Sequence, residues 1–110
     1  MKIEKRHLAE LAVLEFGDNF DRTEHFHHHQ EVITKDGRIE FRKYLDPLIG
    51  HGHLQRIIDG LDFPKGITYW NTLVGICRRD DTDIWSATCE QKAEAILRQD
   101  GSWDTKEGGA

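Results

Sequence analysis

The residues best suited to chemistry form a histidine cluster in the segment HFHHHQE. Four of the seven histidines of the chain fall between positions 25 and 29. In an extended strand, successive side chains point to opposite faces of the sheet, so alternate positions share a face. One face of this segment would then carry three imidazoles and a carboxylate, from His25, His27, His29 and Glu31. Neutral imidazole and carboxylate are ligands of Zn²⁺ and of other divalent transition metals.

The sequence leaves three uses of this cluster open. The first is a metal-binding protein or small metalloenzyme with zinc or a related divalent ion as its cofactor. The second is a polar strand that carries solvent-exposed histidines and needs no cofactor. The third is a pH-sensing or partner-contacting surface, because imidazole titrates close to neutral pH. Protonation of all seven histidines would reverse the sign of the formal charge, which is −5.

Other catalytic patterns are absent from the sequence. It contains no phosphate-binding loop, no dinucleotide-binding glycine pattern, no nucleophile elbow and no HExxH zinc pattern. Cys77 and Cys89 lack CxxC spacing, and we expect them to be buried free thiols. We leave enzymatic activity open but favour a protein without catalysis.

The length and composition predict one domain. The chain has 110 residues, of which 37% are hydrophobic and 32% are charged, and we expect a single domain over 1–104 with a flexible tail over 105–110. The net negative charge argues against nucleic acid as the main partner. No apolar run approaches the length needed to span a bilayer, and no signal peptide is apparent, so we expect a cytoplasmic protein.

Three segments have the spacing and end signals of helices. Apolar residues recur at helical intervals over 5–16, with Gly17 as the terminator, and over about 53–59, before Gly60. A capping box of Thr88 and Gln91 opens a last helix over 90–99, which Gly101 ends.

Two further segments predict hairpins. Asp36-Gly37 favours a two-residue turn that pairs Lys35 with Arg38 and Val32 with Phe41. The stretch ITYWNTLVGICRR, a charged turn and IWSATC are rich in β-branched and aromatic residues and predict a second hairpin. Alternation along it would place a group of apolar side chains together in the core: Trp70, Val74, Ile76 and Trp85.

The order helix, hairpin, helix, hairpin, helix predicts an α+β fold. Its simplest form is one antiparallel sheet of about four strands with the helices packed on one face.

The favoured function is a small non-catalytic binding or accessory protein that acts through protein–protein contacts, including self-association. Inhibitors or modulators carried by phages and mobile elements are of this type. The candidate partner-binding residues are Trp103, Lys35, Arg38 and Arg42. Trp103 follows the last helix in a polar segment, where it either packs back onto the core or anchors another chain.

Overall fold

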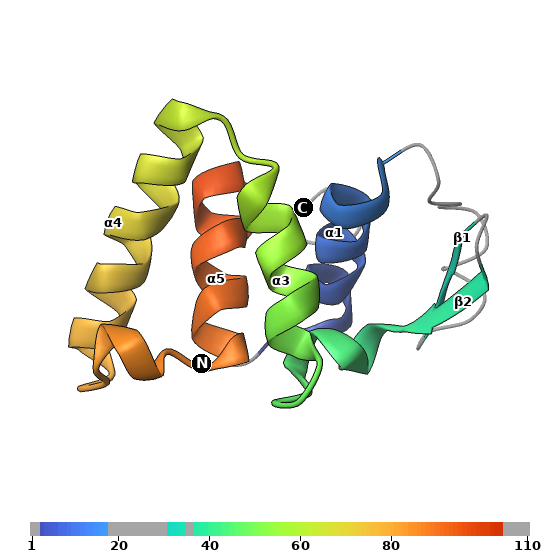
Figure 1. Ribbon diagram of the computed structural model, residues 1–110, viewed down its shortest axis with the longest axis horizontal. Helices are drawn as coiled ribbons and strands as arrows, with labels where there is room; N and C mark the ends of the chain where they lie inside the picture. The colour runs from blue at the N-terminus through green and yellow to red at the C-terminus, as the bar shows by residue number, and fades with distance from the viewer. Residues whose placement is uncertain (1–2, 18–30, 35–36, 105–110) are drawn as a thin grey trace.

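A computed structural model describes residues 3–17, 31–34 and 37–104 (Figure 1). The elements within these ranges are four α-helices, two short 3₁₀ helices and one two-stranded hairpin. In chain order they are α1 (Lys5–Phe16), β1 (Glu31–Thr34), β2 (Gly37–Glu40), η2 (Phe41–Leu45), α3 (Gly50–Asp59), α4 (Phe63–Arg79), η3 (Ile84–Ser86) and α5 (Cys89–Asp100).

The three helices expected from the sequence are confirmed. In α5, Thr88 and Gln91 form the expected reciprocal capping box, and Gly101 ends the helix in the left-handed conformation with φ of 86°. Helix α1 ends at Gly17, whose φ is 54°. Helix α3 contains the expected segment and begins at Gly50.

The prediction of a second hairpin is wrong, because its first strand is part of α4. The Asp62 side chain accepts a hydrogen bond from the Lys65 backbone N–H and caps this helix, and a proline stands in its first turn. Buried residues recur at helical spacing along it: Tyr69, Leu73, Ile76 and Cys77. Burial of this face against α5 outweighs the weak strand preference of β-branched and aromatic residues.

The first hairpin forms, but its predicted register is wrong. Thr34 pairs with Gly37, and Val32 pairs with Ile39 instead of Phe41. The strand ends at Glu40 because the chain turns into η2, which buries Tyr44 completely in the core. A two-stranded hairpin thus stands where a four-stranded antiparallel sheet was expected. The described fold is predominantly helical, and the α+β prediction is wrong.

Helix α5 lies at the centre of the helical layer. Figure 1 shows α4, α5, α3 and α1 side by side, with the hairpin at the opposite end of the molecule from α4. Helix α5 packs against α4, α3 and α1 and buries Ala93, Ile96 and Leu97. Cys77 and Cys89 are buried free thiols, as expected.

Gly50 allows a close contact at the start of α3. A Cβ atom there would lie 2.5 Å from the backbone oxygen of Tyr44, so only glycine lets α3 approach η2 this closely. Among the helices described, none is both long enough and apolar enough to cross a membrane. The expected tail over 105–110 lies outside the described residues.

Candidate functional site

Most residues of the two predicted sites lie outside the described part of the structure. This applies to His25, His27, His29 and Lys35, and to the side chains of Glu31, Arg38 and Arg42. The metal site therefore stays a prediction. Within the described ranges, no cluster of three or more histidine, cysteine, aspartate or glutamate residues could hold a metal ion.

Two other histidines, both on α3, bond to neighbouring helices. The Nδ1–H of His53 donates to Glu15 Oε2 at 3.0 Å, and the Tyr44 hydroxyl donates to Glu15 Oε1 at 2.7 Å. Glu15 is almost fully buried and joins α1 to both α3 and η2. Burial, followed by the charge and hydrogen bond of Glu15, raises the pKa of Tyr44, so the phenol remains a donor.

His51 contacts α5 instead. Its Nδ1 accepts a hydrogen bond from Lys92 Nζ at 3.1 Å. Burial and then the Lys92 charge lower the pKa of His51. The imidazoles of α3 thus make contacts between helices and do not converge on a common site.

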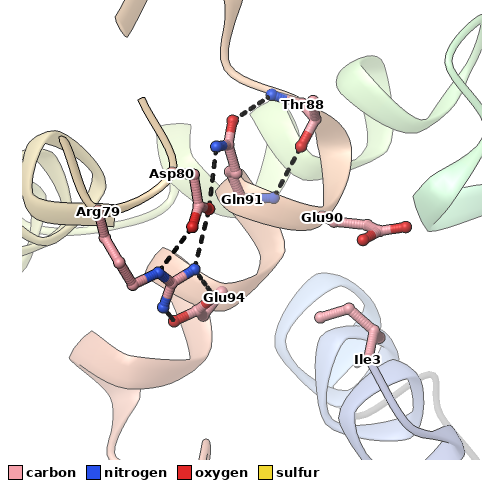
Figure 2. A pocket seen from close by; sticks show the side chains of 7 residues that line it. All are labelled: Ile3, Arg79, Asp80, Thr88, Glu90, Gln91 and Glu94. Atoms are coloured by element: carbon pink, nitrogen blue, oxygen red, sulfur yellow. Dashed lines mark hydrogen bonds and ion pairs between the residues drawn. The ribbon is translucent and has the colours of Figure 1, made fainter. Parts of the chain in front are cut away.

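A polar pocket of about 260 Å³ lies at the junction of α4 and α5 (Figure 2). Its lining includes Arg79, whose guanidinium donates to Glu94 at 2.8 and 2.9 Å and to Asp80 at 2.8 and 2.9 Å. Gln91 donates to Asp80 Oδ2 at 3.1 Å and accepts from the Thr88 N–H at 2.9 Å. These groups satisfy one another's hydrogen-bond donors and acceptors, so the lining of the pocket links α4 to α5. We call this set of contacts the polar joint.

The hydrogen bonds of this joint lower the pKa values of its carboxylates. The hydrogen bonds from Arg79 and then Gln91 hold the pKa of Asp80 at about 2. Burial by itself would raise the pKa of Glu94, but hydrogen bonds from Arg79 and Arg98 outweigh burial, and the pKa is lowered. Both carboxylates are therefore ionised near neutral pH and bind the arginines of their own chain.

Trp103, a predicted partner-binding residue, lies in the core and is 5% exposed. Its ring stacks on His7 with a centroid distance of 4.3 Å, and the Arg98 guanidinium lies 5.2 Å from the ring centroid. Its backbone oxygen accepts a hydrogen bond from His7 Nε2 at 2.9 Å. The sequence left two roles open for Trp103, packing onto the core or anchoring another chain. The structure shows it packed onto the core, which leaves little of the indole surface for a partner.

The structure instead exposes a group of large apolar side chains on α4 and η3. Phe63 is 81% exposed and Trp85 is 84% exposed, while Ile67 and Trp70 are 47% and 46% exposed. On α4, positions 63, 67 and 70 are separated by four and three residues, so their side chains share one face of the helix. The rings of Trp70 and Trp85 meet with a centroid distance of 6.3 Å. We call these four residues the α4–η3 surface.

The middle of α4 carries no charge. Every residue of 66–77, between Lys65 and Arg78, is uncharged, in a protein of which 32% of the residues are charged. One face of this stretch packs on α5, and the α4–η3 surface lies beside it. Exposed helix faces normally carry charged and polar residues. This face therefore differs from an ordinary solvated one.

The sequence predicts Trp70 and Trp85 together, but in the core. The structure brings them together on the surface. The helical spacing of 63, 67 and 70, next to that of 69, 73 and 76, was the signal that could have identified two apolar faces on one helix.

Comparison with known proteins gives no relative on which to base a function: no protein-family model, no curated protein and no solved structure matches the chain. We therefore base the function on the geometry of the α4–η3 surface.

Proposed function

We propose that this chain is a non-catalytic binding protein that associates with a protein partner through the α4–η3 surface. The observation that carries the proposal is the exposure of Phe63, Ile67, Trp70 and Trp85 next to one another. The largest apolar patch on a typical soluble protein measures about 300–600 Å² and is often an interaction site. Tryptophan and other aromatic residues are enriched among the residues that dominate binding energy.

The size of the surface supports a modest but specific contact. An aromatic side chain presents on the order of 200 Å², so the exposed fractions of the four residues amount to roughly 500 Å². Specific interfaces bury about 800 Å² on each partner, and weaker or transient ones bury less. A partner covering this surface and its rim would bind with moderate affinity.

The polar clusters favour binding over catalysis. Arg79, Gln91 and Glu94 bond to one another or to adjacent residues around the pocket. Glu15 and His53 likewise bond to each other between α1 and α3. Both clusters have a structural use that accounts for their charges.

A charge placed on the α4–η3 surface tests the proposal. We expect the wild-type chain, recovered under native conditions from its own host, to carry a protein partner at fixed stoichiometry. The double variant Ile67→Lys/Trp70→Lys should lose that partner while keeping its helical circular dichroism. Leu48→Lys is the control, because Leu48 is an exposed apolar residue outside the α4–η3 surface, in the turn before α3. Recovery of the wild-type chain only as a monomer, or of the double variant with the same partner, would contradict the proposal.

A further inference from the structure

We propose that the partner on the α4–η3 surface is a second copy of this chain, with the two α4 helices packed antiparallel about a twofold axis. This inference rests on the proposed function and identifies the partner. It follows from the spacing of the apolar residues, the charges at the two ends of α4 and the area of the surface.

The apolar spacing along α4 reads the same in both directions. Phe63, Ile67, Trp70 and the half-buried Val74 are separated by four, three and four residues. A reversed copy of this stripe therefore has the same spacing, which is the self-complementarity that a twofold interface requires. When the two stripes are aligned about their midpoints, Phe63 of one copy lies opposite Val74 of the other. Ile67 of one copy then lies opposite Trp70 of the other. Each pair joins a large side chain to a smaller one, as in close helix packing.

The charges at the two ends of α4 favour the antiparallel arrangement. Asp62 caps the beginning of the helix, and Asp59 ends α3 just before it. Arg78 is exposed in the last turn, whereas the guanidinium of Arg79 is bonded to Asp80 and Glu94. The two ends also carry charges of the opposite sign, Lys65 near the start of α4 and Asp81 and Asp83 after its end. Antiparallel packing brings Arg78 of each copy towards Asp59 and Asp62 of the other, whereas parallel packing would bring the two copies of Arg78 together. Exposed pairs of this kind add little affinity but select orientation.

The area predicts a reversible dimer. Two copies of the α4–η3 surface would bury roughly 1,000 Å² in total, which is at the lower end of specific interfaces. Interfaces below about 1,200 Å² are typical of weak, transient contacts. We therefore expect dissociation in the micromolar range, with monomer and dimer both populated at ordinary working concentrations.

Sedimentation equilibrium of the pure, untagged chain tests self-association. Between about 1 and 500 μM, we expect the mass to rise from 12.8 kDa towards twice that value. Trp70→Lys should remain monomeric throughout, Arg78→Glu should weaken the dimer only about two- to fivefold, and the control Leu48→Lys should behave as wild type. Circular dichroism establishes that each variant is folded.

Cysteine cross-linking tests the orientation. In the antiparallel register, the two copies of position 67 lie about 4–5 Å apart along the helix axis, and the two copies of position 78 lie about 28 Å apart. A short thiol cross-linker should therefore join Ile67→Cys to itself but leave Arg78→Cys unjoined. Burial raises the thiol pKa of both native cysteines, which keeps their reaction slow.

The outcomes separate this inference from the proposed function. A wild-type chain that stays monomeric over the whole range overturns self-association, and recovery of a different protein from the host would still support the proposed function. A dimer that persists in Trp70→Lys places the contact elsewhere and contradicts the use of the α4–η3 surface. Cross-linking through both positions overturns the antiparallel arrangement.

Discussion

Trp103→Ala should destabilise the protein much more than Trp85→Ala, although the two substitutions remove the same atoms. Trp103 is 5% exposed and packs against His7 and Arg98, whereas Trp85 is 84% exposed. Truncation of a buried tryptophan costs about 3–5 kcal/mol. Trp85 hides less than one-fifth of its surface, so the same change there should cost below about 1 kcal/mol.

Urea unfolding followed by far-ultraviolet circular dichroism measures both losses, because this signal does not depend on tryptophan fluorescence. In thermal unfolding, a domain of this size loses roughly 4–8 °C of melting temperature per kcal/mol, so Trp103→Ala should also lower the melting temperature by at least about 12 °C. Equal losses in the two variants, or a loss below about 1 kcal/mol for Trp103→Ala, would refute the packed position. Either result would favour Trp103 as an exposed anchor.

The backbone of Trp103 makes a second contribution that a truncated chain would reveal. His7 Nδ1 accepts the Glu4 N–H at 2.9 Å, and its Nε2 donates to the Trp103 oxygen, so both ring nitrogens are bonded and the proton lies on Nε2. A chain that ends at Ser102 leaves the buried Nε2 without this acceptor. The truncation also removes the hydrogen bond from Arg6 Nη1 to the Trp103 oxygen, at 3.2 Å, and the one from the Trp103 N–H to the Leu97 oxygen, at 3.2 Å. The truncated chain should therefore be less stable than Trp103→Ala by about 1–3 kcal/mol, and equal stability would show that these backbone hydrogen bonds contribute nothing.

Three further predictions concern the joints between helices. Glu94→Gln should cost about 1–3 kcal/mol at neutral pH, because its two arginine partners lose a buried anion. The lowered pKa of Glu94 means that its contribution is present above the ordinary value of 4.5 and is lost as the pH falls through the lower folded value. Urea unfolding should therefore show a smaller wild-type-to-variant difference near pH 3, and an unchanged difference would contradict the ion pairs. Gly50→Ala should cost about 1–3 kcal/mol in thermal unfolding, because its Cβ meets backbone. Gly52→Ala, which has open space around the Cβ, should be neutral or stabilising, and equal effects would contradict the contact. Finally, Cys77 and Cys89 should react slowly with a thiol reagent in the folded protein and fully in urea, and fast labelling of the native chain would contradict their burial.

Helix ends could be predicted because their signals are local. The capping box of Thr88 and Gln91 and the terminators Gly17 and Gly101 act within a few residues, and the structure shows each of them in use. Such signals need no knowledge of the tertiary fold.

Helix α4 could not be distinguished from a strand by composition. Apolar residues on two adjacent faces, such as Tyr69 with Leu73 and Ile67 with Trp70, merge into a nearly continuous apolar run. Such a run is also typical of a buried strand, so periodicity alone does not decide between the two. Packing against α5 selected the helix.

The exposure of Trp70 and Trp85 depends on the position of α4 in the fold. In Figure 1, α4 is the outermost helix of the layer, with α5 on its inner side. The local sequence indicates that a helix face is apolar, but it does not indicate which element, if any, packs on that face. The histidine cluster at 25–29 lies outside the described residues, and its metal-binding role stays a prediction.

Photochemical cross-linking in the native host tests the central claim most directly. A benzophenone side chain at position 67, on the α4–η3 surface, is compared with one at position 55, an exposed position on α3. We expect a protein adduct from position 67 and little or none from position 55, and an adduct between two copies of this chain would support self-association as well. An adduct with a different protein would support the binding function alone. The absence of any adduct from position 67 above the level at position 55 would contradict the α4–η3 surface as a protein-binding site.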